Sequence, residues 1–184
     1  MESDVRKVSA SRRELEADSW AFALALYARP GVAKACLALQ NELDVDVMLL
    51  LMVTFAAVRH RILLTPGEIR ALDATCGPWR EQVVRKLRAI RTHLKTGPAS
   101  APARTTEQFR AQVKALELEA EKIQNQLLAE RLPLRPGQEK VRHEQLRAIL
   151  NEVAKRGGRP GTNLGASLSS SIAAIVEAAM QDAS

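Results

Sequence analysis

An apolar run at residues 47–58, which Thr54 alone interrupts, restricts the fold of this chain more than any other feature. A membrane-spanning helix needs about 20 mostly apolar residues, whereas runs of about 10–14 usually form buried helices of soluble proteins. Charged residues also stand close to both ends of the run, namely Asp44, Asp46 and Arg59. We therefore expect a core helix that other helices surround, rather than a membrane span.

Composition indicates a soluble globular protein with unpaired thiols. Of the 184 residues, 46% are hydrophobic and 26% are charged, which is typical of a folded domain. Residues 1–20 mix both charge signs and lack the apolar centre of a secretion signal, so we expect a cytoplasmic protein. Cys36 and Cys76 belong to no CxxC pattern, which suits a reducing compartment. We expect both to be small buried side chains rather than nucleophiles or metal ligands.

Helical periodicity dominates the sequence, and no segment sustains the alternation of a strand. We expect an all-α fold: a compact bundle of about five helices with an appended long amphipathic helix and a C-terminal helical tail. Asp44 or Asp46 should cap the core helix. Thr65 and Glu68 form a capping box at the start of the fourth helix.

The fifth helix of the bundle should be separate from the fourth. Gly77 and Pro78 predict the end of the fourth helix, because glycine accepts the left-handed conformation there and proline cannot continue a helix. Pro78 is also well placed to begin the next helix, at residues 78–95, because the first helical position needs no amide donor.

Shifts in composition divide the chain into segments. These are a flexible N-terminus (1–13), a helical bundle core (14–95), a Pro/Ala-rich linker (96–104), an amphipathic helical hairpin (105–157) and a Gly/Ser/Ala-rich C-terminal segment with a marginal helix (158–184). The segment TGPASAPART indicates the linker, because proline and small polar residues interrupt helical periodicity there. The last helix should fray without a partner surface, because isolated helices of this length are barely stable in water.

A seam of apolar residues follows the linker. Its members step alternately by four and three residues: Phe109, Val113, Leu116, Ala120, Ile123 and Leu127. The seam is shorter than the about three to four heptads that identify a coiled coil, so packing against the bundle and dimerisation both remain open. As a partner-binding surface we select five of its residues, Phe109, Val113, Leu116, Ile123 and Leu127.

The net charge is +6, and basic residues are most concentrated in the predicted fifth helix. Its cations are Arg80, Arg85, Lys86, Arg88, Arg91 and Lys95, against a single acid, Glu81. Such clustering is typical of contacts with nucleic acid or other anions, and the preceding helix and CGP break loosely resemble a helix-turn-helix. Any two helices joined by a glycine-containing turn share that resemblance, so a solvated basic face is our preferred interpretation.

No group of residues in the sequence indicates a catalytic or metal site. His60, His93 and His143 lie far apart without metal-ligand spacing. Asp44 and Asp46 form a DxD pattern, but it directly precedes a helix, where carboxylates cap the backbone. Walker, GxGxxG and GxSxG motifs are absent. We therefore predict that the protein is not an enzyme and needs no cofactor or metal.

Several short sequence segments together are similar to those of a known family. They are LALYARPGV after Trp20 and Phe22, CLALQ, DVDVMLLL, LDATCGPWREQVVRKLR and VKALELEAEKIQNQLL. In combination they resemble a family of small proteobacterial conserved hypothetical proteins, classed as a domain of unknown function. The resemblance covers roughly residues 18–131 and leaves the C-terminal residues outside. It implies no reaction, ligand or catalytic residue.

The function that these patterns favour is protein binding. We expect a non-catalytic, cytoplasmic helical interaction module, an adaptor or scaffold, that binds a protein partner or a second copy through amphipathic helices and does not insert into membranes. A first alternative is a nucleic-acid-binding protein that uses the basic helix 79–95. A second is a small-ligand-binding bundle with a pocket between the core helix and Trp20, Tyr27 and Trp79.

Overall fold

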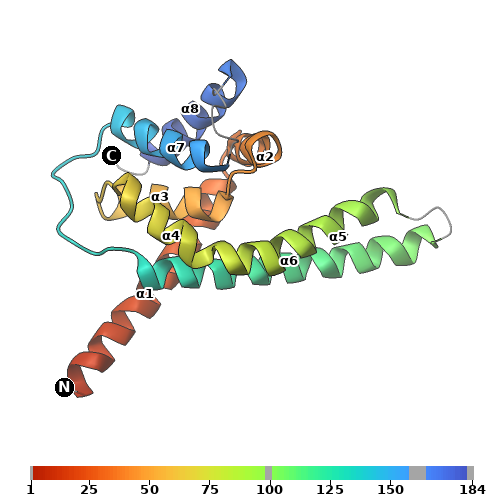
Figure 1. Cartoon of the computed structure of the whole chain (residues 1–184), viewed down its shortest axis with the longest axis horizontal. Coiled ribbons are helices and arrows are strands. Elements are labelled where there is room, and N and C mark those ends of the chain that lie inside the picture. Colours follow the sequence, from red (N-terminus) through yellow and green to blue (C-terminus); the bar gives the residue numbers. More distant parts are fainter. Residues whose placement is uncertain (1, 98–100, 158–164, 182–184) are drawn as a thin grey trace.

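The structure, a computed structural model, describes residues 2–97, 101–157 and 165–181, with residues 2–11 described by their backbone alone (Figure 1). In chain order the helices are α1 (Glu2–Tyr27), α2 (Val32–Leu43), α3 (Val47–Arg59), α4 (Pro66–Trp79), the short π-helix η1 (Arg80–Val84), α5 (Arg85–Thr96), α6 (Ala103–Arg131), α7 (His143–Gly157) and α8 (Ala166–Met180). The described residues contain no strand, which confirms the all-α class.

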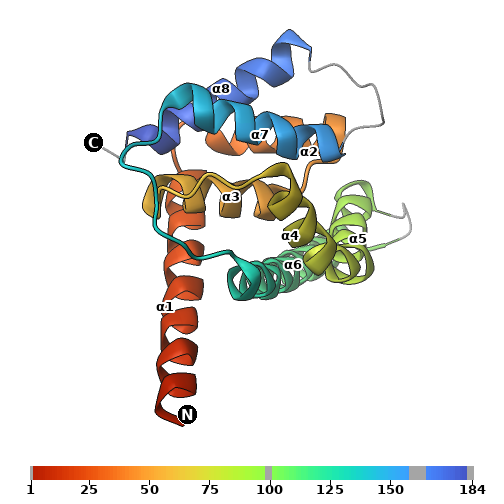
Figure 2. The ribbon, with the colours of Figure 1, turned by 60° about the vertical axis from the view of Figure 1, so that its left-hand side comes forward.

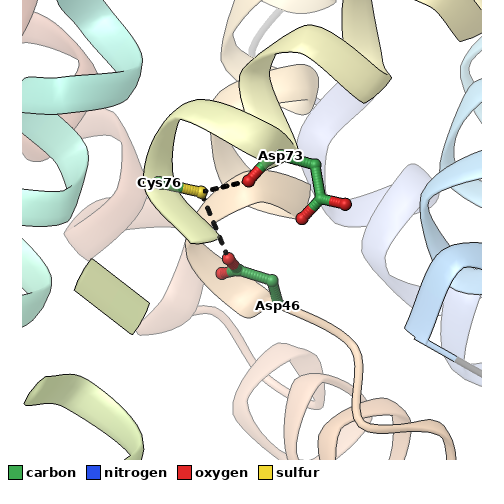
Figure 3. A group of neighbouring side chains, drawn as sticks. All are labelled: Asp46, Asp73 and Cys76. Carbon is green, nitrogen blue, oxygen red and sulfur yellow. Dashed lines mark hydrogen bonds between the residues drawn. The ribbon is translucent and has the colours of Figure 1, made fainter. Parts of the chain in front are cut away.

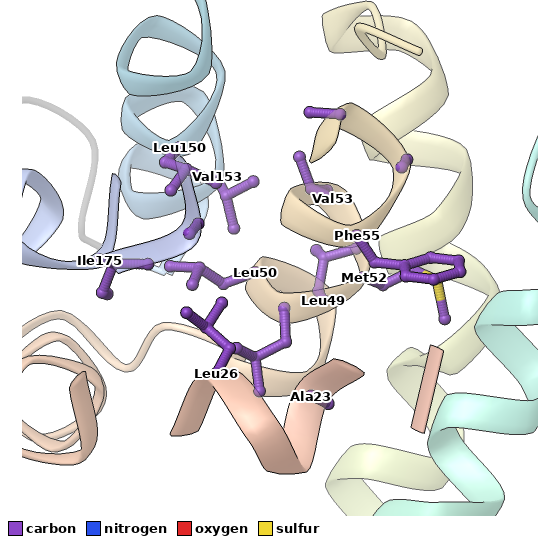
Figure 4. Packing of buried hydrophobic residues seen from close by; sticks show 14 of the residues in the cluster. Ala23, Leu26, Leu49, Leu50, Met52, Val53, Phe55, Leu150, Val153 and Ile175 are labelled. Atoms are coloured by element: carbon purple, nitrogen blue, oxygen red, sulfur yellow. The ribbon is translucent and has the colours of Figure 1, made fainter. Parts of the chain in front are cut away.

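Helix α3 is the buried centre of the fold. Its side chains from Met48 to Val58 are all 9% exposed or less, and the hydroxyl of Thr54 donates to the carbonyl of Leu50 at 2.8 Å. Helices α1, α4, α6, α7 and α8 all pack on it. Figure 4 shows Leu26 of α1 and Ile175 of α8 beside Leu50. The apolar run is therefore a core helix, as predicted.

No single helix among the described residues is both long enough and apolar enough to span a membrane. Only residues 12–27 of α1 together with α2 combine enough length and apolar character, and those two helices meet at an angle of 98°.

The predicted capping residues of α3 and α4 are confirmed. Asp46 is the N-cap of α3, and its carboxylate accepts the backbone N–H of Leu49. Thr65 and Glu68 form the expected capping box at α4, and Arg135 also contacts the Glu68 carboxylate. These short-range signals work because the groups that satisfy a helix end are only a few residues away in the chain.

The predicted break at Gly77 and Pro78 is wrong, because α4 runs past both residues and through η1 into α5. Proline lacks an amide donor and its ring clashes with the carbonyl four residues earlier, so it normally kinks or ends a helix. Here the helix passes Pro78 within α4, and the turn that follows is π-helical, with the N–H of Arg85 donating to the carbonyl of Arg80. The arrangement is thus not a helix-turn-helix, since no turn separates α4 from α5.

Helices α5 and α6 form an antiparallel hairpin, which we call the arm, and the end of the arm where α5 ends and α6 begins lies away from the other helices (Figures 1 and 2). Helix α6 packs along α5, and it also packs on α1, α3 and α4. Helix α7 packs instead on α2, α3, α4 and α8. The hairpin expected at residues 105–157 would pair α6 with α7. In the structure α6 pairs with α5 instead.

The two end segments that the sequence set apart both contain helix in the described residues. Residues 2–13, expected as a flexible N-terminus, belong to α1. Helix α8, expected as marginal, packs on α2, α3 and α7 and buries Leu168, Ile172 and Ile175. The other parts of the predicted C-terminal segment, residues 158–164 and 182–184, lie outside the described residues.

Replacement of Ile175 by alanine tests whether α8 is part of the core. Ile175 is 0% exposed, so Ile175→Ala should lower the free energy of unfolding by about 2–5 kcal/mol. Urea denaturation followed by circular dichroism measures this change. Ser170→Ala, on the exposed side of the same helix, should change it by less than about 0.5 kcal/mol. Equal effects of the two substitutions would contradict the docking of α8.

Candidate functional site

Buried charge is concentrated where α3 begins. The Asp46 side chain is 8% exposed, and its Oδ2 accepts hydrogen bonds from Arg80 Nη1 at 2.7 Å and Gln124 Nε2 at 2.6 Å. One carboxylate thereby joins α3, η1 and α6. A buried polar group is costly without partners, so these bonds offset the cost of burying the Asp46 side chain here.

Arg80 links this carboxylate to a second one. Its Nη1 also lies 2.7 Å from Asp73 Oδ1 on α4, and Asp73 Oδ2 accepts from Arg156 Nη2 of α7 at 2.7 Å. We call Asp46, Asp73, Arg80 and Arg156 the charged cluster. Burial by itself would lower the pKa of Arg80, but hydrogen bonds and charge from the two carboxylates raise it. The guanidinium therefore stays protonated.

The two carboxylates of the charged cluster lie beside the thiol of Cys76, and Asp46, Asp73 and Cys76 together form a group of potential metal ligands (Figure 3). Their ligand atoms lie within 4.8 Å of one another. The cation that these carboxylates already hold is the guanidinium of Arg80, so a metal ion would have to displace it. Burial, together with the charge of Asp46, raises the pKa of Cys76 to about 12, which keeps its thiol protonated and a poor ligand.

A hollow of about 260 Å³ lies beside the charged cluster, but the charges around it are paired. Besides the cluster it is lined by Asp44, Glu81 and Arg85, and Arg85 forms ion pairs with both acids. Leu49, Val153 and Gly157 complete the lining. Chemically, this arrangement can hold α3, α4, η1 and α7 together; it offers no nucleophile and no unpaired charge among the residues that line it.

The arginines of the predicted basic helix are engaged with carboxylates. The pairs are Arg80–Asp46, Arg80–Asp73, Arg85–Asp44, Arg85–Glu81, Arg88–Glu117, Arg88–Glu121 and Arg91–Glu117. Lys86 and Lys95 are exposed, and neither forms an ion pair within the described ranges. Arginines that are already paired offer less net charge to a phosphate backbone.

Glu117 joins the two helices of the arm. This carboxylate is only 5% exposed, yet it accepts from Arg88 Nε at 2.8 Å and also from Arg91. Next to it, Glu121 accepts from Arg88 Nη2 at 2.8 Å. Burial raises the pKa of Glu121, while the charge of Arg88 lowers it. Ion pairs therefore connect α5 with α6.

Sequence reasoning did not find the buried polar residues of α6, which are Glu117, Gln124 and Asn125. Polar residues on an amphipathic helix are normally assigned to its solvent face. A weak signal was present, because Glu117 and Gln124 are seven residues apart and share a face with Val113 and Ala120. The amide of Asn125 donates to Ser19 Oγ of α1 at 3.0 Å, a partner that only the fold brings near.

The structure divides the predicted apolar seam of α6 into two parts. Val113 is 4% exposed, and Leu127 is half-buried. Phe109, Leu116 and Ile123 are 53%, 57% and 42% exposed. Residues seven apart lie on the same face of a helix, so these three form one exposed apolar line, which we call the outer row.

The remaining candidates take part in packing. The indole N–H of Trp79 donates to the carbonyl of Ala120 at 2.9 Å, and Trp20 and Tyr27 pack against the core. Cys36 is buried, as expected, and burial raises its pKa to about 12. His60 stacks edge-on against a core phenylalanine at 5.0 Å between ring centroids.

Comparison with known proteins gives one match. The model of a family described as "Protein of unknown function (DUF2390)" matches residues 18–128. No curated protein and no solved structure matches the chain. The matched region includes α3, the ionic contacts between α5 and α6, and the outer row, whereas α7 and α8 lie outside it.

Removal of the Arg80 guanidinium tests the charged cluster. Arg80→Met leaves two carboxylates, Asp46 and Asp73, without their shared cation, so we expect the free energy of unfolding to fall by about 3 kcal/mol or more. Denaturant titration measures the change. Arg85→Met removes ion pairs whose arginine is 34% exposed, and it should cost less than about 1 kcal/mol. A small loss for Arg80→Met would show that the cluster does not hold these helices together.

Acid stability tests Asp73 separately. Burial opposes its ionisation, but hydrogen bonds from Arg156 and Arg80 outweigh burial and hold the pKa below its ordinary value of 3.8. A carboxyl with a lowered pKa in the fold stabilises it above the unfolded pKa, and this contribution is lost as the pH falls through the folded pKa. Asp73→Asn should therefore flatten the fall in unfolding free energy below about pH 4. An unchanged slope in urea titrations across this range would refute the assignment.

Proposed function

Because the chain belongs to the DUF2390 family, whose description assigns no reaction, we propose that it is a non-catalytic, cytoplasmic protein-interaction module. Its binding surface is the outer row on the arm. The observation that carries this proposal is the exposure of Phe109, Leu116 and Ile123 on one face of a helix hairpin whose end stands away from the other helices (Figure 1).

The distribution of exposed apolar side chains supports this surface. The large exposed hydrophobic residues among those described are Leu24, Leu37, Ile90, Phe109, Leu116, Leu118, Ile123 and Leu134. Most of them lie on the arm. Isolated exposed leucines are common on protein surfaces, but an aligned row is typical of a helix that docks on a partner. Full burial of each such side chain would stabilise a complex by at most about 1.5–3 kcal/mol.

The two alternative functions have less support. A nucleic-acid surface on residues 79–95 would rely on arginines that carboxylates of the same chain already hold, which leaves Lys86 and Lys95 as its main cations. A small-ligand site usually has a mostly apolar lining with a few polar groups. The hollow beside the charged cluster has mainly charged walls instead.

Affinity capture with point variants tests the outer row. Deletion of α6 is unsuitable, because its Asn125 and Leu128 are part of the buried interior. Phe109→Glu places a charge on the row without removing a core residue, and Leu24→Glu, at a position on α1 that is 48% exposed, is the matched control.

The tagged protein should retain a stoichiometric protein after nuclease treatment of the extract. Phe109→Glu should reduce the retained amount at least about tenfold, because a charge in a docked apolar row costs more than about 1.4 kcal/mol. Leu24→Glu should leave it unchanged. Retention that nuclease abolishes, and that Lys86→Gln with Lys95→Gln weakens, would favour the nucleic-acid alternative.

A further inference from the structure

We propose that the protein which docks on the outer row is a second copy of this chain, with the two α6 helices antiparallel and the two-fold axis at Leu116. This inference rests on the proposed function, because it names the occupant of the same surface. It goes beyond the proposed function, because that function does not require the partner to be a second copy.

The outer row is self-complementary about Leu116. Phe109 and Ile123 stand equally far from it on opposite sides, so a two-fold axis at Leu116 brings Phe109 of one copy against Ile123 of the other. Leu116 then meets its own equivalent. Each exposed side chain of the row thus gains an apolar partner, and the spacing of seven residues matches that of helices packed side by side.

The polar residues beside the row favour the antiparallel orientation. Thr105, Gln112, Glu119 and Gln126 also recur every seven residues, and all are exposed. In the antiparallel pair, Gln112 lies within one residue, about 1.5 Å along the helix, of the level of Glu119 of the second copy, where the amide can donate to the carboxylate. A parallel pair would instead set Glu119 against Glu119, and like charges at such positions are destabilising.

The shape of the molecule favours the same orientation. The end of the arm where α6 begins stands away from the other described helices, whereas the opposite end of α6 carries the packed helices α1, α3 and α4 (Figures 1 and 2). Antiparallel pairing places the two sets of packed helices at opposite ends of the dimer. A parallel pair would crowd both at one end.

Helix α5 carries one further large exposed apolar side chain, Ile90, which is 46% exposed. Two paired arms would contain four helices. The row spans only about 21 Å of helix, so the interface lies near the lower end of the about 1,200–2,000 Å² that stable complexes bury. We expect a dimer that dissociates on dilution, with a dissociation constant on the order of 1–100 μM.

Mass measurement in solution tests the use of the row. Above the expected dissociation constant, light scattering should give twice the 20.2 kDa mass of the chain. Leu116→Glu should return the mass to that of one chain while helicity by circular dichroism stays unchanged. Leu118→Glu is the matched control, because Leu118 is 46% exposed on the same helix but points about 200° away from Leu116. It should stay dimeric.

Introduced cysteines test the orientation. The native Cys36 and Cys76 are buried, so new surface thiols can be cross-linked selectively with a short bis-maleimide. Leu116→Cys should form a covalent dimer, and so should a mixture of Phe109→Cys and Ile123→Cys chains. Ile123→Cys alone should remain monomeric on denaturing gels. A covalent dimer from Ile123→Cys alone would overturn the antiparallel arrangement.

The two proposals can fail separately. A chain that keeps the mass of one copy up to about 1 mM overturns the second-copy inference. If Phe109→Glu then still removes a bound protein of another sequence, the proposed function stands without it. A dimer whose mass Leu116→Glu leaves unchanged overturns the use of the outer row by a second copy.

Discussion

The guanidinium of Arg80, held between Asp46 and Asp73, is the contact on which the other helices depend. It connects the capped start of the core helix α3 with α4, and through Asp73 it reaches Arg156 on α7. Gln124 of α6 binds the same Asp46 carboxylate. Buried ion pairs recover little net free energy, since desolvation offsets their attraction, but an unpaired member is strongly destabilising. The cluster therefore favours the arrangement in which all these helices meet.

The π-helical turn η1 has two consequences for the molecule. It begins at Arg80, whose guanidinium enters the charged cluster. It also continues as α5, which carries Arg88 and Arg91 to Glu117 on α6. Glu117 faces inward together with Val113 of α6, whereas Leu116 lies on another face of the helix and remains exposed.

Sequence patterns predicted the features that local interactions decide. The length and apolarity of residues 47–58 indicated a core helix, and Thr65 with Glu68 indicated the start of α4; both are observed. The predicted break at Gly77 and Pro78 was wrong, because tertiary context can override local propensity. Helix α8 was judged marginal for the same reason: its stability comes from burial against α2 and α7, not from its own sequence.

The sequence by itself determined that this chain is helical, that α3 is buried and where most of its helices begin, because periodicity and capping act over a few residues. Only the tertiary structure decided which face of α6 is buried. Glu117 and Gln124 face inward because arginines of α5 and the cap of α3, remote in the chain, provide their partners. An amphipathic pattern contains no information about such distant partners, so it cannot distinguish a buried carboxylate from a solvated one.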